Sequence, residues 1–345
     1  MSTSRSKRTR RHARLAVLLG VTVFLIAQGV AALLVEQWFP RWKEARLCAC
    51  TEHFRARARM GETVVFLGTS RTQYGIKTQP LEPHLCTNLG RPVSVLNFAI
   101  PGATSLTLQR VWRHLPNDGT PPTIAVVEIV PATLDETCPR TDVSLGETPA
   151  GEMDFADIQE TKKLDEAPRH PLLDNVLART FPWYGHRLVI TGRLMPELQP
   201  TAGRRVPADF GDIDTDPPAG ERGAALQLAH DRYYNRLSNF HLGSRHLQDL
   251  ADLLRDIRAA NVPVILLVPP EGPLYRSWYA PGAWQEIEQA LRDLAEHAGC
   301  TFVTTREWMP EESFFDSHHL TVEGGKQFSE RLGREVLTPA LQASH

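Results

Sequence analysis

The sequence predicts an α/β protein: a three-layer α/β/α sandwich around a central, mostly parallel five-stranded sheet, preceded by one N-terminal transmembrane helix. Its 345 residues are 42% hydrophobic and 23% charged, an ordinary globular composition with enough length for a sizeable core. Five short apolar runs are continuous rather than alternating, as in strands buried on both faces of a sheet. Amphipathic helical patterns lie between these runs, and such alternation is typical of a parallel sheet between helix layers.

The first 35 residues predict a membrane anchor. Residues 1–14 contain six Lys or Arg and no acid, and Leu15–Val35 has no charged residue. At about 1.5 Å per residue this stretch crosses a bilayer core of about 30 Å. Trp38 and Trp42 follow at the expected interface, and the positive-inside rule places residues 1–14 in the cytoplasm. The alternative, a cleaved signal peptide, has a shorter apolar region of about 7–15 residues. We expect an uncleaved single-pass anchor in the cell membrane, with the remaining chain outside the cytoplasm.

Residues 36–60 are rich in Arg and Glu and predict a helical stalk, which is followed by the main α/β domain over residues 61–340. The domain begins with three apolar runs and resumes the pattern after a long gap. The predicted strands are Thr63–Gly68, Val93–Ala99, Thr123–Val130, Val262–Val268 and Thr301–Thr304. The predicted helices between and after them are Leu106–Leu115, Leu247–Ala260, Trp284–Ala298 and Val322–Leu337.

The gap at about residues 132–239 predicts an insertion in this domain. It is rich in Pro, Gly and acidic residues and also carries Trp183, Tyr184, Tyr233 and Tyr234. A structureless loop of this length is uncommon, so we expect a mixture of helix and loop. It is either a passive surface excursion or a cap over the carboxyl edge of the sheet, where ligands of open α/β sheets bind.

Charge and cysteine content exclude some functions. Without the basic segment the chain has 32 basic and 40 acidic residues, a net charge of −8, so we expect no nucleic-acid partner. The five cysteines are an odd number, and the lone Cys48-Ala49-Cys50 pair lacks the further ligands of a zinc site.

Two short stretches carry the candidate chemistry. Ser70 follows the first predicted strand and Gly68, and Asp316 precedes His319 by three positions ahead of the last predicted helix. A serine, a histidine and a carboxylate are the nucleophile, base and base-orienting group of covalent acyl transfer. The spacing favours His319 over the adjacent His318 as the base. The alternatives are ordinary helix caps and a surface histidine.

These stretches resemble the SGNH/GDSL hydrolase superfamily. Gly68-Thr69-Ser70 is similar to its nucleophile block, with Thr where many members have Asp, and Asn97–Gly102 is similar to its second block. Asp316-Ser317-His318-His319 is similar to its final D-x-x-H block. The resemblance covers about residues 63–131 and 240–338. It implies the flavodoxin-like α/β/α fold of the family, and it involves neither the insertion nor the anchor.

The resemblance also implies roles for single residues. Ser70 is expected to be the nucleophile, His319 the base and Asp316 its orienting carboxylate, while the N–H groups of Ser70 and Gly102 form an oxyanion hole. No metal or organic cofactor is implied.

One departure concerns the Asn that the family usually places after the third strand. Here that strand continues into Glu128-Ile129-Val130-Pro131-Ala132 without an Asn. Arg71, Gln73 or Asn97 could supply the missing oxyanion donor. The loss of one such donor typically costs about 10²–10³ in rate.

Three functions follow as hypotheses. The first is a membrane-anchored serine O-acyl esterase or acyltransferase acting on an acylated envelope or extracellular glycan. The second is a lipid esterase or phospholipase at the membrane. The third is a non-catalytic scaffold or polymer-binding component of an export complex, with protein partners in the envelope. The retained Ser, His and Asp favour an enzyme, and the missing Asn favours the scaffold.

Overall fold

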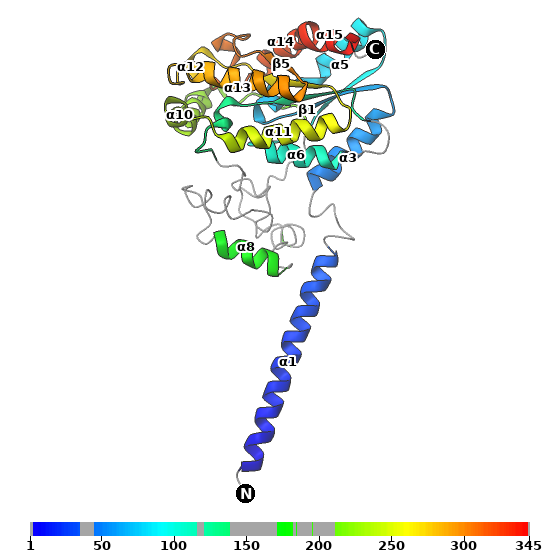
Figure 1. Ribbon diagram of the computed structural model, residues 1–345, viewed down its shortest axis with the longest axis vertical. Coiled ribbons are helices and arrows are strands. Elements are labelled where there is room, and N and C mark those ends of the chain that lie inside the picture. Colours follow the sequence, from blue (N-terminus) through cyan, green and yellow to red (C-terminus); the bar gives the residue numbers. More distant parts are fainter. Residues whose placement is uncertain are drawn as a thin grey trace. The chain divides into compact units, whose positions relative to one another are not determined.

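The computed structural model describes residues 3–34, 45–115, 121–138, 171–181, 184, 195 and 211–343. Its internal contacts divide the chain into two units. The first combines Met1–Cys48 with Thr148–Pro207, and the second combines Ala49–Glu147 with Ala208–His345. The second unit contains all the strands that the structure describes (Figure 1).

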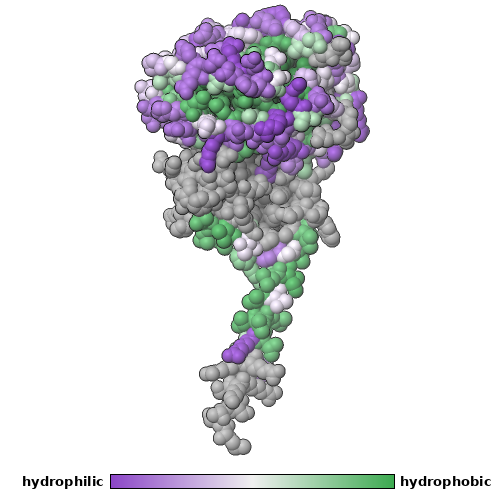
Figure 2. Space-filling model, in the orientation of Figure 1, coloured by the Kyte–Doolittle hydropathy of each residue, from purple (hydrophilic) through white to green (hydrophobic). Residues whose placement is uncertain are grey.

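The first unit contains the predicted apolar helix. Helix α1 (Thr3–Leu33) includes the stretch His12–Ala31, which is long and apolar enough to cross a membrane. Hydrophobic residues form most of the coloured surface of this helix in Figure 2, and their large apolar side chains are exposed. Helix α8 (Pro171–Thr180) belongs to the same unit, and the ring of Phe181 lies 6.0 Å from that of Phe24. The chain orientation across a membrane stays a prediction.

The second unit is built on a five-stranded sheet in which every pairing is parallel, with the strand order β2-β1-β3-β4-β5. The predicted fold class is therefore confirmed. The strand bounds differ from the predicted ones only at the ends, because the flanking residues carry the chain out of the ladder. The strands are β1 (Glu62–Leu67), β2 (Val93–Asn97), β3 (Ile124–Glu128), β4 (Val264–Val268) and β5 (Thr301–Thr304).

Helices cover both faces of this sheet (Figure 1). Each buries an apolar stripe, as its sequence pattern predicts. One layer contains α6 (Ser105–His114), α11 (Ser244–Ala259) and α13 (Ala283–Ala298). The other contains α5 (Thr78–Leu89), α14 (Val322–Leu332), the π-helical turn η7 (Gly333–Leu337) and α15 (Thr338–Ala343).

The segment predicted as a stalk contains helix α3 (Ala45–Ala58). This helix buries Cys50 and Phe54 and makes polar contacts with residues of the second unit. Thr51 Oγ1 donates to the carbonyl of His114 at 2.7 Å, and Arg57 pairs with Glu82. Most of α3 thus packs on the α/β body, while residues 36–44 lie outside the described residues.

Several helices, all short except α10, gather beyond the carboxyl ends of the strands. They are α4 (Ser70–Gly75), η2 (Pro131–Leu134), η5 (Ala219–Glu221), α10 (Arg222–Ser238), α12 (Pro273–Arg276) and η6 (Glu311–Ser313). Helix α10 is the last part of the predicted insertion. Its Leu237 packs with Tyr275 and Trp278, and the cluster also takes in Val130 from the end of β3. Trp183 and most of the insertion lie outside the described residues.

The carboxyl edge of the sheet has a topological switch point, where successive connections leave in opposite directions along the sheet. Strand β1 has β2 on one side and β3 on the other, so the connections leaving β1 and β2 run in opposite directions. Such switch points are where open α/β sheets bind ligands. Ser70 stands at this point, two residues beyond Gly68.

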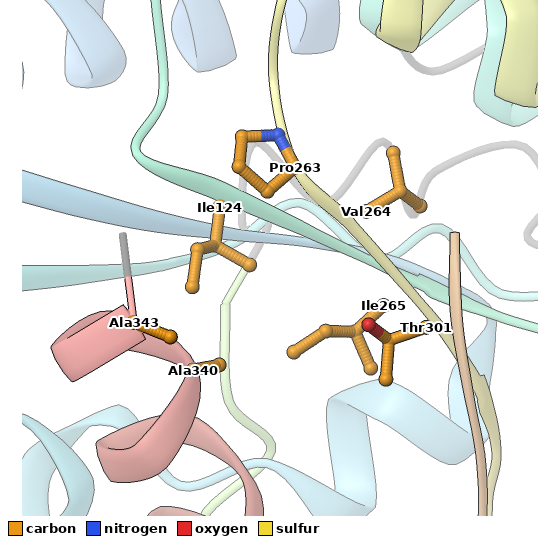
Figure 3. Close-up of a pocket in the computed structure, with 7 residues that line it drawn as sticks. All are labelled: Ile124, Pro263, Val264, Ile265, Thr301, Ala340 and Ala343. Atoms are coloured by element: carbon orange, nitrogen blue, oxygen red, sulfur yellow. The ribbon is translucent and has the colours of Figure 1, made fainter. Parts of the chain in front are cut away.

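A hollow of about 280 Å³ opens at the other edge of the sheet (Figure 3). Its lining comes from the first residues of β3, β4 and β5 and from α15, and it is largely apolar. Because it lies at the amino ends of the strands, it is separate from the edge that carries Ser70. The lining residues are Ile124, Pro263, Val264, Ile265, Thr301, Ala340 and Ala343.

Candidate active site

The turn after β1 presents Ser70 as the first residue of α4. Thr69 has extended backbone angles and caps the helix, with its Oγ1 accepting from the N–H of Arg71 at 3.2 Å. Any side chain at Gly68 would collide with Thr72 and with the carboxylate of Glu128. The Gly-Thr-Ser order therefore builds a tight strand-to-helix turn with the serine at its exit.

Glu128 fixes this turn from the neighbouring strand. Its side chain at the end of β3 is almost fully buried. One carboxylate oxygen accepts from the N–H groups of Thr69 at 2.8 Å and Thr72 at 3.1 Å, and also from the Thr72 hydroxyl. The other accepts from the Thr69 hydroxyl at 2.9 Å. The buried carboxylate of Glu128 thus accepts hydrogen bonds from residues on both sides of Ser70. The sequence pattern did not reveal this role.

The loop between β5 and α14 carries the acid–base pair. Asp316 accepts twice from His319: the backbone N–H contacts Oδ1 at 2.7 Å and the ring Nδ1 contacts Oδ2 at 2.7 Å. Between them Ser317 has a φ of 65°, the left-handed conformation that non-glycine residues seldom adopt. The spacing of three residues therefore closes a tight turn in which the carboxylate orients the imidazole.

The two loops meet at a hydrogen bond between Ser70 Oγ and His319 Nε2 of 2.8 Å. With Nδ1–H donating to Asp316, Nε2 is the unprotonated nitrogen that accepts the serine proton. Burial alone would raise the pKa of Asp316, but hydrogen bonds from His318 and His319 outweigh burial and hold that pKa well below its ordinary range. The carboxylate is consequently ionised throughout the neutral range. The structure thus brings together the three residues singled out in the sequence.

His318 points into a different environment. Its ring stacks on Tyr275 at 5.4 Å and meets Tyr233 edge-on at 5.1 Å, and the residue is buried. Burial, helped by the neighbouring His319, lowers the pKa of His318 to about 4. His318 is therefore a neutral member of the aromatic cluster, and the histidine that contacts Ser70 is His319.

Aromatic rings also surround His319. Phe315 stacks on the imidazole with ring centroids 5.5 Å apart, and Tyr74 lies 5.1 Å away. Phe315 N–H donates to the carbonyl of His319 at 3.1 Å, so ring and backbone contacts restrict the base together. Tyr74 belongs to α4, the helix that Ser70 begins. These contacts limit rotation of the imidazole away from the serine.

Two of the proposed oxyanion donors are backbone amides. The N–H of Ser70 lies in the first turn of α4, where no intrahelical acceptor exists. Gly102 occupies a turn with a φ of 72°, beyond Ile100, whose N–H donates to the carbonyl of Gly68 at 2.9 Å. The second-block loop is thus attached to the nucleophile turn, and the amides of Ser70 and Gly102 are candidates for binding an oxyanion.

The side chains considered as a third donor have other partners. Asn97 donates to the carbonyls of Thr72 and Ile76 and to Asp212, and Gln73 donates to the carbonyl of Ala99. Both amides therefore support the strand ends. Arg71 is buried and contacts Pro270 and Glu271. Its two Nη atoms face that contact, while its buried Nε has no hydrogen-bond partner among the described residues.

One group of described residues has a donor set that could take a metal ion. The ligand atoms of Asp316, His318 and His319 lie within 4.8 Å of one another. A metal there would occupy the carboxylate and ring nitrogens that form the chain from Asp316 to Ser70. Metal binding and the serine–histidine–aspartate arrangement are thus alternatives at the same atoms.

Comparisons with known proteins give limited similarity. A protein-family model matches residues 224–340, which is less than half of the chain. No curated protein is similar enough in sequence to serve as a relative.

Several solved structures match this chain at low identity and low TM-score. The crystal structure of TesA is 13% identical, with a TM-score of 0.40 over 82% of this chain and 100% of that one. A variant of Axe2, an acetyl xylan esterase from Geobacillus stearothermophilus, is 13% identical, with a TM-score of 0.35 over 79% and 92% of the two chains. LAE5, an α/β hydrolase from the metagenome of Lake Arreo, is 14% identical, with a TM-score of 0.32 over 82% and 94%. Values this low leave the chemistry to be argued from the site itself.

Proposed function

We propose that the protein is a serine O-acyl esterase or acyltransferase that uses Ser70, His319 and Asp316. The observation that carries the proposal is the unbroken chain of two hydrogen bonds, 2.8 Å from Ser70 Oγ to His319 Nε2 and 2.7 Å from His319 Nδ1 to Asp316. Its members come from loops almost 250 positions apart in the sequence, at the edge of the sheet where ligands bind. A purely structural or polymer-binding domain has no need of this arrangement.

The geometry supports a two-step reaction. Ser70 Oγ attacks the acyl carbonyl carbon while its proton passes to His319 Nε2, and the carbonyl oxygen becomes an oxyanion held by the N–H groups of Ser70 and Gly102. His319 then returns the proton to the departing alcohol oxygen, which leaves an acyl ester on Ser70. Water or a second hydroxyl attacks this ester with the same base, and Ser70 regains its proton.

The ionised Asp316 stabilises the imidazolium that forms in each step. Its low pKa means that it remains a carboxylate while His319 carries the proton, so the proton stays on the imidazole. The carboxylate also fixes the Nδ1–H tautomer that leaves Nε2 free to act as a base. Ser70, His319 and Asp316 are sufficient for these proton transfers.

The substrate class follows from the anchor. We place the catalytic unit outside the cytoplasm, on a chain whose helix α1 is apolar enough to span a membrane. An acylated envelope or extracellular glycan is the substrate that this location favours, with water or a sugar hydroxyl as acyl acceptor. If transfer occurs, the donor is a membrane-delivered acyl group or an acylated polymer, because cytoplasmic thioesters do not reach the site.

Hydrolysis of p-nitrophenyl acetate by purified protein tests the proposal. Ser70→Ala and His319→Ala should each abolish turnover above the uncatalysed rate. His297→Ala is a matched control, since this exposed histidine lies on α13, where its ring bonds the carbonyl of Asp293. Equal activity in Ser70→Ala and wild type would exclude the serine mechanism.

A further inference from the structure

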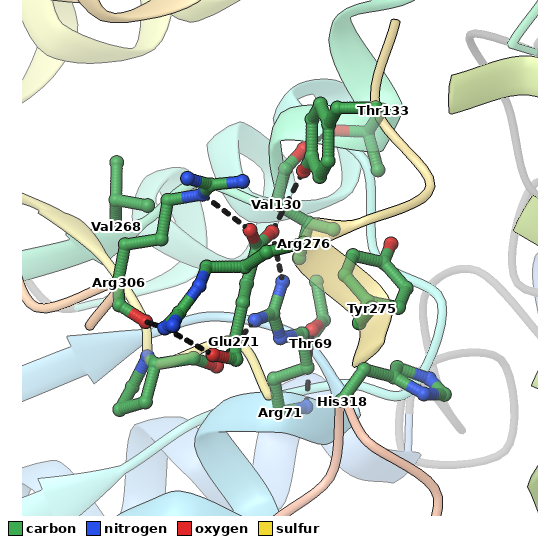
Figure 4. Close-up of polar contacts among 12 residues, drawn as sticks. Thr69, Arg71, Val130, Thr133, Val268, Glu271, Tyr275, Arg276, Arg306 and His318 are labelled. Atoms are coloured by element: carbon green, nitrogen blue, oxygen red, sulfur yellow. Dashed lines mark hydrogen bonds and ion pairs between the residues drawn. The ribbon is translucent and has the colours of Figure 1, made fainter. Parts of the chain in front are cut away.

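A second buried carboxylate, Glu271, lies beyond the end of β4, outside the serine–histidine–aspartate chain. It is fully buried and accepts from Arg306 Nε at 2.6 Å, from the Tyr279 hydroxyl at 2.7 Å and from Arg71 Nη1 at 3.5 Å. In Figure 4 these contacts converge on the Glu271 side chain. Arg71 and Arg306 are themselves buried, so each requires an anionic partner.

The arginine on one side of Glu271 is the residue next to the nucleophile. Arg71 follows Ser70 in α4, and its Nη2 donates to the carbonyl of Pro270 at 2.5 Å, next to the carboxylate contact. Because α4 is only six residues long, the position of its first turn depends on such tertiary contacts. Glu271 and Pro270 therefore hold the nucleophile helix through Arg71, in addition to the contacts that Glu128 makes with Thr69 and Thr72.

The same segment reaches the acid–base loop. Gly272 N–H donates to the carbonyl of Ser317 at 2.8 Å, and Tyr275 N–H donates to the Ser317 hydroxyl at 2.9 Å. A side chain at Gly272 would collide with Ser317, so the close approach requires glycine. Ser317 is the residue in the left-handed conformation between Asp316 and His318. The segment Pro270–Tyr275, called here the bridging segment, thus contacts a direct neighbour of Ser70 and a direct neighbour of Asp316.

The bridging segment is anchored at its far side. Glu271 N–H donates to the carbonyl of Arg306 at 2.9 Å, and Arg276 Nη1 donates to the carbonyls of Glu271 at 3.0 Å and Arg306 at 3.2 Å. The guanidinium of Arg306 lies over Trp284 at 4.4 Å and over Tyr279 at 4.8 Å. Glu271 therefore connects the anchored guanidinium of Arg306 on one side to the buried guanidinium of Arg71 on the other.

We propose that Glu271 is a positioning residue, which through Arg71 and the bridging segment sets the distance between the nucleophile turn and the acid–base loop. This inference rests on the proposed function of Ser70 and His319 and adds to it a determinant of their alignment. A misplacement of about 1 Å at such a pair can cost about 10²-fold in rate. The loss should appear in kcat, since Glu271 is buried and does not meet the substrate.

The test compares Glu271→Gln with Glu288→Gln. The control removes the carboxylate of an exposed pair, Glu288 with Arg292 at 2.5 Å on α13. Active sites are counted with a fluorophosphonate, and kcat and KM for p-nitrophenyl acetate are expressed per labelled site. We expect kcat of Glu271→Gln to fall about 10²-fold with KM nearly unchanged, and Glu288→Gln to match wild type. A wild-type kcat per labelled site, with losses only in yield or melting temperature, would overturn the proposal.

A second variant covers the case in which Glu271→Gln does not fold. Ser317→Gly removes the hydroxyl that accepts from Tyr275 while suiting the positive φ, so relief of backbone strain partly offsets the lost hydrogen bond and the variant should fold. Loss of this one hydrogen bond should lower kcat by about tenfold. A wild-type kcat in Ser317→Gly would contradict the bridging role.

The two proposals fail in different ways. Equal turnover in wild type and Ser70→Ala would overturn the serine mechanism and the positioning role that depends on it. An inactive Ser70→Ala together with a normal kcat in either Glu271→Gln or Ser317→Gly would overturn the positioning role alone.

Discussion

At the scale of single residues, Asp316 and His319 have separable tasks. Asp316→Asn keeps the size and most hydrogen bonds of the side chain but removes the charge that stabilises the imidazolium and fixes its tautomer. We expect turnover to fall by up to about 10⁴-fold while the fold persists. Steady-state kinetics beside circular dichroism measure both. A variant with the wild-type rate would show that another group orients His319.

His318 should affect acid stability more than catalysis. Its pKa of about 4 in the folded protein lies below its ordinary value of 6.5, so the unfolded chain binds this proton first as the pH falls. The contribution of neutral His318 to stability is complete above pH 6.5 and is lost as the pH drops towards 4, by about 3 kcal/mol at most.

His318→Phe should remove that pH dependence and retain most turnover, because a phenyl ring can preserve the stack on Tyr275. Urea unfolding of the variant and wild type at pH 7 and pH 4.5 measures the difference. If the two proteins lost equal stability between these values, titration of His318 would not be the cause. An inactive His318→Phe beside an active His319→Ala would reverse the assignment of the base.

At the scale of elements, the nucleophile turn depends on the strand beside it. In Glu128→Gln the amide oxygen can keep the contacts with the N–H groups of Thr69 and Thr72, but the N–H₂ group then faces the Thr69 hydroxyl and the negative charge of the acceptor is lost. We expect a loss of about 1–3 kcal/mol in the free energy of unfolding and at least a tenfold fall in kcat. Chemical denaturation and kinetics check both, with the exposed carboxylate in Glu330→Gln as control. An unchanged kcat would mean that Gly68 and Thr69 shape the turn without Glu128.

The sequence was sufficient for some elements and not for others. Ser70, Asp316 and His319 were predictable because a strand exit and a spacing of three residues are local patterns. Glu128 and Glu271 were not, because their roles depend on β3 and β4 lying beside the turns that follow β1 and β5, and a lone Glu after an apolar run carries no mark of burial. Asn97 was considered as an oxyanion donor, yet its amide binds the backbone of α4 and Asp212.

At the scale of the whole molecule, the strand pattern predicted the five-stranded parallel sheet because continuous apolar runs are specific to doubly covered strands. The insertion was less predictable. Its helix α10 (Arg222–Ser238) packs on η2 and α12 through residues that are scattered in the sequence, and the cap function stays a hypothesis. The membrane orientation also stays a prediction. It was inferred from the charge bias and length of the N-terminal segment, and no contact among the described residues bears on it.

A reporter fused after His345 tests that orientation. Residues 1–14 should be cytoplasmic and the chain beyond about Glu36 outside, because six Lys or Arg and no acid precede the span, whereas the basic residues that follow it are fewer and are mixed with Glu36 and Glu44. Alkaline phosphatase at the carboxyl terminus should therefore be active and a cytoplasmic fluorescent reporter dark. A fluorescent fusion would contradict both the orientation and the envelope substrate.

The central claim is that Ser70 carries the acyl group in a covalent intermediate. Reaction with a fluorophosphonate, followed by proteolysis and mass spectrometry, tests it most directly, with Ser238→Ala as a control at the end of α10. The account predicts a single adduct on the peptide that contains Ser70, formed in wild type and Ser238→Ala, absent in Ser70→Ala and strongly slowed in His319→Ala. An adduct on another residue, or labelling that persists in Ser70→Ala, would contradict it.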